Sequence, residues 1–194
     1  MSTSSDVSPA GYPITVLLER PQRSSRLLLI FRGFLAFPHF FFALVVFLLA
    51  YVAVLISYVV VLITGRNPFA GFVAGVLRYV TRLSAYLQYL TDKYPPFSLG
   101  EDPDYPVRVV IPQPGKLPRW RVLSSFLLFP HYIALYVVLI IAGILTIFVW
   151  VAILITGRYP AGFFGFISGA LRWQTRVNAY VFLVAQSYPP FSLD

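Results

Sequence analysis

The chain has 194 residues, of which 58% are hydrophobic, 18% aromatic and only 11% charged. A soluble domain carries about a quarter charged residues, so part of this surface is expected to face lipid or protein. Cysteine is absent, which excludes disulfides, thiolate metal sites and thiol nucleophiles. The net charge of +8 comes largely from arginines that flank apolar runs, which favours membrane-flanking positive charge over a nucleic-acid partner.

The first segments of the chain are polar and then extended. Residues 1–11 are Ser-rich and are expected to be disordered. They lack the basic-then-apolar order of a signal peptide, so we expect an inserted rather than a secreted protein. Tyr12–Pro21 (YPITVLLERP) reads as a short extended segment, and Tyr105–Pro114 (YPVRVVIPQP) matches it. Because an isolated strand is unstable, the two are expected to pair or to cover a surface.

Two long uncharged runs dominate the chain, Gly33–Gly65 and Val122–Gly157. Both exceed the roughly 18 residues that distinguish a membrane candidate from a buried soluble helix. Each carries Phe-Pro-His near its start and Ile-Thr-Gly-Arg at its end. A basic cluster precedes each run, comprising Arg20, Arg23, Arg26 and Arg32 in the first case and Lys116, Arg119 and Arg121 in the second. The pattern predicts two membrane-embedded segments.

A third element follows each run after a Gly-Arg turn, in which glycine ends one helix and proline starts the next. Phe69–Thr91 and Ala161–Gln186 read as amphipathic helices with wide apolar faces. Each then stops at Tyr-Pro-Pro-Phe-Ser-Leu, Tyr94–Leu99 and Tyr188–Leu193, because consecutive prolines cannot continue a helix.

The same order of elements occurs twice, which indicates a tandem duplication. We divide the chain into a disordered N-terminus (1–11), repeat 1 (12–99), an acidic linker (100–104) and repeat 2 (105–194). The predicted fold class is an all-α integral membrane protein with two tandem repeats. Each repeat has a long transmembrane helix and an amphipathic helix, with a short extended segment before it.

The length of the runs leaves three membrane arrangements open. One crossing needs about 20 residues and two need about 40, whereas the runs have about 33 to 36. In the first arrangement a break near Pro38 or Pro130 leaves Phe40–Ile63 and Ile133–Ile155 as single spans. In the second the amphipathic helix also crosses. In the third each run is a shallow hairpin with all arginine flanks on the cytoplasmic side. We favour the first, with the amphipathic helix flat on the membrane.

Four motifs recur or nearly recur in the two repeats: Phe-Pro-His, Thr-Gly-Arg-Tyr-Pro, Leu-Arg-Trp and Tyr-Pro-Pro-Phe-Ser-Leu. With these motifs the chain resembles a bacterial integral-membrane family catalogued as domain of unknown function 4389, present as two tandem copies from Tyr12 to Leu193. The first copy departs from the pattern with Asn67 for Tyr and Tyr79 for Trp. The resemblance implies a membrane setting but no reaction, because the family has no established activity.

His39 and His131 are the only histidines and occupy equivalent positions. Two imidazoles from pseudo-symmetric helices could ligate a haem iron or another metal. In the alternative interpretation each ring bonds the backbone that the preceding proline frees. Because no Asp, Glu or Cys stands beside either histidine, we favour this alternative and predict no cofactor.

The best candidates for a binding role are Arg78 and Arg82, with Arg172 and Arg176 in the second repeat. Residues four apart share one helix face, so each pair could bind a lipid phosphate with two guanidinium groups. The alternative is snorkelling, in which arginine covers apolar surface while its charged group stays in water. We predict lipid-headgroup binding at these four residues.

No catalytic motif stands in the apolar segments, which lack paired carboxylates, phosphate-binding glycine loops and metalloprotease signatures. We therefore predict a non-enzymatic multi-pass membrane protein, a lipid-contacting scaffold or an accessory subunit of a membrane assembly. Its expected location is the bacterial inner membrane, with a cytoplasmic N-terminus. The expected partners are membrane lipids and a homo-oligomer or larger complex, without nucleic acid. The alternative is a small-molecule transporter or binding protein with its site between the repeats.

Overall fold

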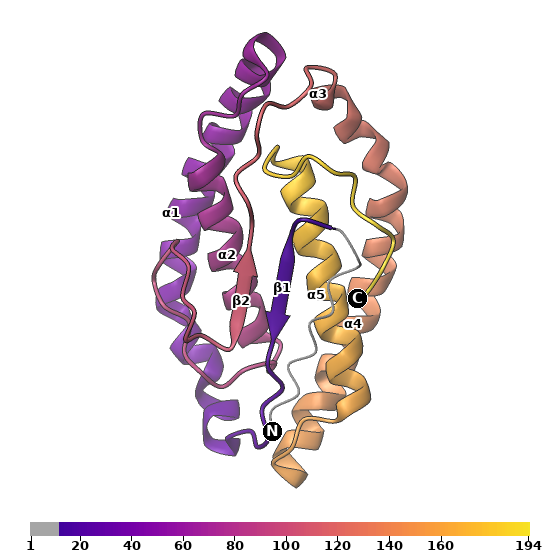
Figure 1. Cartoon of the computed structure of the whole chain (residues 1–194). Helices are drawn as coiled ribbons and strands as arrows, with labels where there is room; N and C mark the ends of the chain where they lie inside the picture. Colours follow the sequence, from indigo (N-terminus) through magenta and orange to yellow (C-terminus); the bar gives the residue numbers. More distant parts are fainter. Residues whose placement is uncertain (1–11) are drawn as a thin grey trace.

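The computed structural model describes residues 12–194, so the predicted disorder of residues 1–11 lies outside the described residues. The described chain is mostly helical, as predicted (Figure 1). Its two longest helical stretches are apolar and long enough to cross a membrane. The elements in order are β1 (Thr15–Leu18), α1 (Arg26–Thr64), α2 (Ala70–Leu87), β2 (Val107–Val110), α3 (Arg121–Ser124), the 3-10 helix η1 (Ser125–Leu128), α4 (Phe129–Thr156) and α5 (Ala161–Val181).

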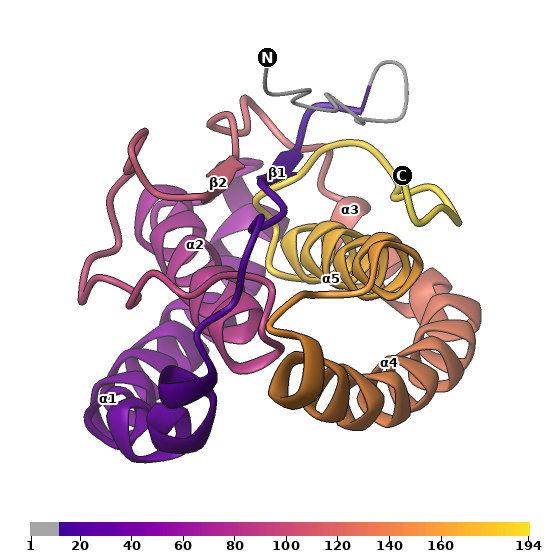
Figure 2. The ribbon, with the colours of Figure 1, turned by 90° about the horizontal axis from the view of Figure 1, so that it is seen from below.

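The elements form three layers, which Figure 2 shows from below. Strands β1 and β2 cover one side of α2 and α5, and α1 and α4 pack on the other. The main core lies between the strands and the inner helices, where Val16 and Val109 meet small residues such as Ala74 and Ala170. We expected α2 and α5 to lie flat on a membrane, whereas in the structure they form the inner layer. The reason is that their arginine stripe faces the strands rather than solvent or headgroups.

An approximate twofold axis relates the two repeats. Antiparallel pairing of the strands places Val16 opposite Val109, and each of these stands four residues after the Tyr of its Tyr-Pro motif. The hydroxyls of Thr81 and Thr175, each of which precedes an arginine, approach to 3.1 Å. Equivalent residues meet at both places, so the axis passes through the strand pair and between the inner helices, perpendicular to the long helices.

As a consequence, α1 and α4 run antiparallel. At one end the Nη2 of Arg26 donates to the carbonyl of Ile155 at 2.7 Å. At the other end the backbone N–H of Leu117 donates to the carbonyl of Gly65 at 2.7 Å. Gly65 and Gly157 end their helices in the left-handed conformation, with φ of 73° and 67°, as the Ile-Thr-Gly-Arg motif predicts.

The predicted break near Pro38 is wrong, because α1 runs through this residue without interruption. The helix begins earlier, where the side chain of Ser25 accepts a hydrogen bond from the N–H of Leu28 and caps the first turn. Proline removes a single donor from a helix that is already established on both sides. In repeat 2 the break is present: η1 precedes α4, and Pro130 lies in the first turn of α4, where proline is tolerated.

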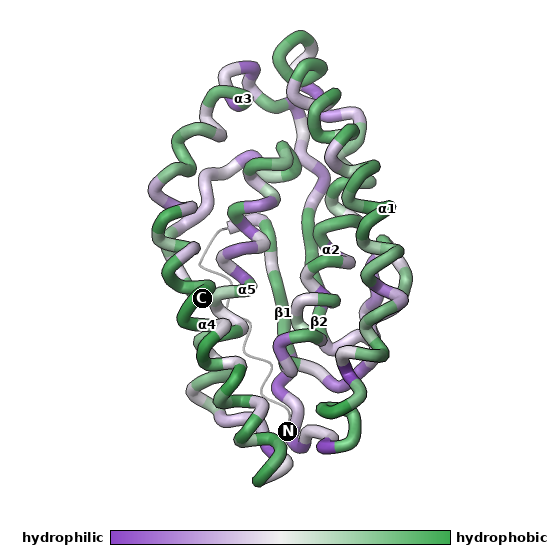
Figure 3. The backbone as a smooth tube through the Cα atoms, turned by 180° about the vertical axis from the view of Figure 1, so that it is seen from behind, coloured by the Kyte–Doolittle hydropathy of each residue, from purple (hydrophilic) through white to green (hydrophobic). Residues whose placement is uncertain are grey.

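The long helices are covered on one narrow stripe only. In α1 this stripe follows residues three or four apart, such as Ala43, Val46 and Ala50. The rest of the circumference is apolar and exposed, with Phe34 in α1 79% exposed and Ile155 in α4 70% exposed. Figure 3 shows this hydrophobic character along both helices. The outer layer is therefore a large apolar surface without protein cover.

Candidate functional site

His39 lies in an aromatic cage formed by three segments of repeat 1. Its side chain is fully buried on α1, and its ring stacks on Phe97 with centroids 4.0 Å apart. Its Nδ1 lies 2.8 Å from the hydroxyl of Tyr79 on α2. Tyr94 closes the cage at 4.8 Å between centroids. The Tyr-Pro-Pro-Phe-Ser-Leu segment thus locks the Phe-Pro-His motif against the inner helix.

Repeat 2 builds the same cage around His131 with a different donor. The ring of His131 stacks on Phe191 at 3.6 Å between centroids, and Tyr188 lies at 5.0 Å. The indole Nε1–H of Trp173 donates to Nδ1 of His131 at 3.0 Å. Because indole nitrogen is only a donor, Nδ1 must accept, and the neutral imidazole carries its proton on Nε2.

The two cages explain the histidines as internal packing groups. Nε2 of His39 and of His131 is buried without a hydrogen-bond partner in the described chain. Within residues 12–194 no group of three or more His, Cys, Asp or Glu side chains could hold a metal ion. The alternative interpretation is wrong about the partner, because Nδ1 faces an aromatic side chain of the inner helix rather than the backbone freed by proline.

The arginines of α2 attach it to the strand of the other repeat. Nε of Arg78 donates to the carbonyl of Val109 at 3.2 Å, and its Nη2 pairs with Glu101 at 2.8 Å. Nη2 of Arg82 donates to the carbonyl of Gly100 at 2.8 Å. Arg82 is only 1% exposed, and this burial lowers the pKa of its guanidinium.

The arginines of α5 repeat this arrangement across the axis. Nε of Arg172 donates to the carbonyl of Val16 at 3.1 Å, so each strand of the axial pair is held by the opposite repeat. Nη2 of Arg176 donates to the carbonyl of Ser192 at 2.6 Å, and Nη1 donates to that of Asp194 at 2.5 Å. Burial lowers the pKa of Arg176 as well.

These contacts give each of the four arginines a partner within the protein, while Nε and Nη1 of Arg82 and Nε of Arg176 are buried without a hydrogen-bond partner in the described chain. Their guanidinium groups lie beneath the strands and linkers and satisfy main-chain carbonyls, which would otherwise be costly to bury. Such burial leaves little of Arg82 or Arg176 for a phosphate to reach. Lipid-headgroup binding at Arg78, Arg82, Arg172 and Arg176 stays an untested prediction, and the geometry gives them a structural role.

The model of one family, described as a domain of unknown function (DUF4389), matches residues 26–98 and 122–192. The matches cover most of the chain, one on each repeat. The chain belongs to this family. No curated protein and no solved structure matches it. The tandem organisation predicted from the motifs is thereby confirmed. The motifs named above fall on these contacts, since they supply the caged histidine, the residue that meets its Nδ1, the arginines Arg78 and Arg172, and the stacking phenylalanine.

Sequence reasoning missed two further buried arginines, Arg32 and Arg121. Arg32, which is 3% exposed, donates through Nη1 to the carbonyl of Tyr86 and pairs through Nη2 with Asp92, both at 2.5 Å. Arg121, which is 1% exposed, donates to the carbonyl of Tyr180. The sequence shows each only as a member of a basic cluster before an apolar run, and the cluster does not reveal which member turns inward.

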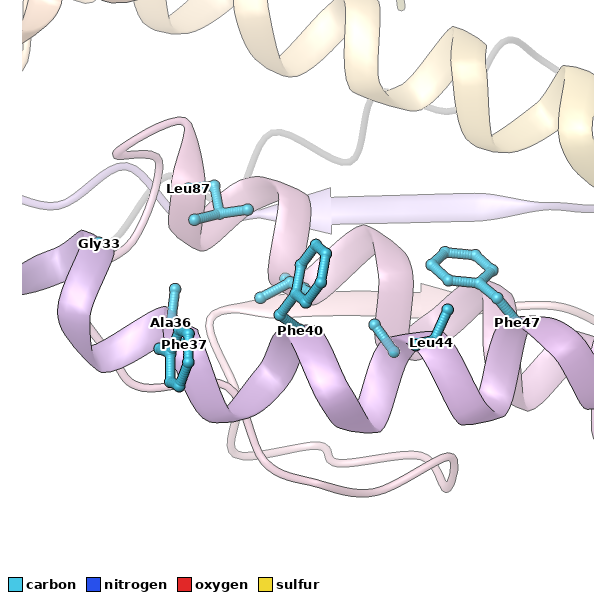
Figure 4. Close-up of a pocket in the computed structure, with 9 residues that line it drawn as sticks. Gly33, Ala36, Phe37, Phe40, Leu44, Phe47 and Leu87 are labelled. Carbon is cyan, nitrogen blue, oxygen red and sulfur yellow. The ribbon is translucent and has the colours of Figure 1, made fainter.

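An apolar groove opens between α1 and the end of α2 in repeat 1 (Figure 4). Its volume is about 610 Å³, and no charged or hydrogen-bonding side chain lines it. The lining residues are Gly33, Ala36, Phe37, Phe40, Ala43, Leu44, Phe47, Leu83 and Leu87. Ligand sites for polar molecules contain a few precisely placed polar groups. This groove lacks them among its side chains and suits a hydrocarbon chain.

Proposed function

We propose that this DUF4389 protein is a non-enzymatic membrane protein whose long helices α1 and α4 dissolve in bilayer hydrocarbon. In this proposal it contacts lipids as a scaffold or accessory subunit of an assembly in the bacterial cell membrane. The observation that carries the proposal is the apolar exposure of α1 and α4 along their whole length. A patch of this size marks a protein or membrane interaction surface.

The energetic scale supports hydrocarbon as the solvent of this surface. Each large apolar side chain gains on the order of 1.5–3 kcal/mol when it leaves water. Both ends and the middle of the long helices expose such side chains, including Phe34, Leu48, Phe129 and Ile147, which are between 60% and 79% exposed. In water alone, dozens of these side chains would stay exposed, and the free energy of transfer out of water would not be gained.

The polar side chains argue against the other function classes. The histidines and the buried arginines Arg82 and Arg176 are engaged in contacts within their own repeat or with the linker. The transporter alternative requires a polar site between the repeats within the layer of the long helices, whereas the pocket that Ile14 forms with Gln113 and Gln186 lies beside the strands. The groove of Figure 4 instead belongs to repeat 1, and its lining side chains are apolar. A single bound acyl chain is the occupant that fits it.

Membrane extraction tests the proposal directly. We expect the full chain to stay with the membrane after an alkaline carbonate wash. When it is extracted in polymer nanodiscs, we expect native mass spectrometry to find lipid or a protein partner still bound. Recovery of a folded, monodisperse chain from the supernatant without detergent would contradict membrane insertion. Recovery as a lone monomer without lipid or partner would contradict the scaffold role.

A matched pair of glycine variants tests lipid binding in the groove. Gly33 lines the groove, and a Cβ added there meets nothing within 4 Å. Gly143 on α4 is equally unobstructed and lies outside the groove. We expect Gly33→Leu to reduce the number of lipids retained in native mass spectra by one, and Gly143→Leu to leave it unchanged. Equal lipid retention in both variants would contradict occupation of the groove.

A further inference from the structure

We propose that α1 and α4 do not cross the bilayer but lie in its plane, immersed in one leaflet, with the twofold axis along the membrane normal. This inference rests on the proposed membrane function and replaces the crossing that the sequence favoured. The partner surface is one leaflet of an anionic bilayer. Its hydrocarbon takes up the apolar outer layer, and its phosphates meet the basic residues at both ends of the long helices.

The length of α1 argues against an upright crossing. The uncharged run Gly33–Gly65 lies almost entirely in this one unbroken helix. At 1.5 Å per residue its 33 residues extend about 50 Å, whereas the hydrocarbon core is about 30 Å thick. Fitting the run inside the core requires a tilt of about 53°, beyond the roughly 0–40° found for membrane helices. An in-plane helix has no such limit.

The position of the strands argues against crossing as well. The axis passes through Val16 and Val109, so the two-stranded sheet stands level with the middle of the long helices. Upright helices would place this sheet at the centre of the bilayer. The adjacent pair of Glu19 and Arg108, 3.9 Å apart and with side chains 63% and 38% exposed, would lie there too. Charges facing lipid are not tolerated at that depth.

Charge marks both ends of the apolar layer. At one end, the exposed residues Arg20, Arg23 and Arg26 lie before or at the start of α1, and Arg158 follows α4. At the other end, Arg66 follows α1, and Lys116 and Arg119 precede α3. The segment before α1 meets the end of α4 in the first group, because the N–H of Ser24 donates to the carbonyl of Gly157 at 2.9 Å. With the helices in plane, both groups reach the phosphates of the same leaflet, which attract Lys and Arg by about 1 kcal/mol each. The strand face then points to water.

Labelling of single cysteines separates the two orientations. The chain contains no cysteine, and the exposed residues Gln22 and Pro68 flank α1 at its two ends. In sealed membrane vesicles of either orientation, we expect a membrane-impermeant maleimide to label Gln22→Cys and Pro68→Cys from the same side. Labelling from opposite sides would overturn the in-plane placement. Leu48→Cys, at the middle of α1, should react only after detergent is added.

Spin labels measure the depth of α1 directly. Phe34, Phe41, Leu48, Leu55 and Leu62 are seven residues apart and all exposed. In nanodiscs with one-third anionic lipid, oxygen and nickel-chelate accessibilities of labels at these positions give their depths. We expect the five depths to agree within about 10 Å, a helix diameter. An upright helix instead places Leu48 about 21 Å deeper than Phe34 and Leu62, and that result would overturn the inference.

The two experiments distinguish failure of orientation from failure of the proposed function. If Leu48→Cys reacts in intact vesicles without detergent, the helix is not in hydrocarbon, and the membrane function itself fails. If this position is protected while Gln22→Cys and Pro68→Cys react from opposite sides, membrane insertion stands and only the in-plane placement fails. Protection with labelling from one side supports both.

Discussion

In each repeat an arginine binds the end of the inner helix, but the two arginines come from different positions in the chain. In repeat 1 Arg32 of α1 donates to the carbonyl of Tyr86, and in repeat 2 Arg121 of α3 donates to that of Tyr180. The tyrosines are equivalent, but the arginines are not, because Ser124 occupies the place that corresponds to Arg32, seven residues before the histidine. The carbonyl that accepts the hydrogen bond is equivalent in the two repeats, whereas the arginine that donates to it occupies a different position in each.

The physical reason lies in the end of the inner helix. Carbonyls in a last helical turn lack intrahelical donors and carry partial negative charge, so a cation there is favourable. The guanidinium carbon lies 4.6 Å from the ring centroid of Tyr86 in repeat 1 and 3.2 Å from that of Tyr180 in repeat 2. Repeat 1 adds Asp92, for which repeat 2 has Gln186. The carbonyl is the common requirement, and the ion pair is specific to repeat 1.

The largest effect is expected at a contact that both repeats share. A Cβ on Gly169 would lie 2.5 Å from the carbonyl oxygen of Leu193, and one on Gly75 would lie 2.9 Å from that of Leu99. We expect Gly169→Ala to lower the free energy of unfolding by about 3 kcal/mol, and Gly75→Ala by somewhat less, because the backbone must move. Unfolding by SDS in a mild detergent, followed by circular dichroism, measures both.

Gly165 provides the matched control on the same helix, since a Cβ there meets nothing within 4 Å. Gly165→Ala should raise stability by up to about 1 kcal/mol, because alanine is the better helix former. If Gly165→Ala and Gly169→Ala behaved alike, the close approach of the Tyr-Pro-Pro-Phe-Ser-Leu segment to the inner helix would be refuted, and with it the closure of the cages.

An intermediate effect is expected where the repeats differ. Asp92 accepts from Nη2 of Arg32 at 2.5 Å and from the backbone N–H of Ser25 at 2.7 Å. Asp92→Asn removes the negative charge and leaves a buried cation, so we expect a loss of about 2 kcal/mol in the same unfolding assay. Gln186→Asn, at the exposed corresponding position, should change stability by less than about 0.5 kcal/mol. Equal losses would mean that the ion pair contributes nothing specific to repeat 1.

The sequence predicted the parts of the fold that depend on local chemistry. Gly65 and Gly157 end the long helices because their motif favours a left-handed residue, and the two Tyr-Pro segments form paired strands. The pattern of α2 did not reveal its place in the inner layer. A stripe of arginines has the same spacing whether it meets water, phosphates or the carbonyls of the molecule's own strands. Only the long-range packing decides among these.

The same limit applied to the candidate site. The equivalence of His39 and His131 could be read directly, but their partners could not. Tyr79 in place of Trp173 looks like a departure from the motif, yet both side chains present a polar atom to Nδ1 of the histidine. The difference in residue type concealed the fact that Tyr79 and Trp173 occupy equivalent positions. Pro38 misled for a related reason, since the cap that establishes α1 lies more than ten residues before it.

The smallest loss of stability is expected on the twofold axis, where equivalent substitutions in the two repeats should have equal effects. Thr81 and Thr175 each lie 2.8 Å from the carbonyl four residues earlier in their own helix and 3.1 Å from each other. A hydroxyl has one proton, so only one of the pair can donate across the axis at a time while the other donates within its helix. Thr81→Val and Thr175→Val should therefore each cost about 0.5–1 kcal/mol, equally within error.

A double-mutant cycle isolates the contact between the repeats. Each single variant leaves the other hydroxyl free to donate to its own helix, so the coupling energy reflects only the bond across the axis, about 0.5 kcal/mol. Arg32 and Arg121 reach equivalent carbonyls from unequal positions, so they should give unequal losses when each is replaced by methionine. Unequal losses for Thr81→Val and Thr175→Val would place the axis elsewhere. The strands pair about the same axis at Val16 and Val109. They would then no longer have to stand level with the middle of the long helices.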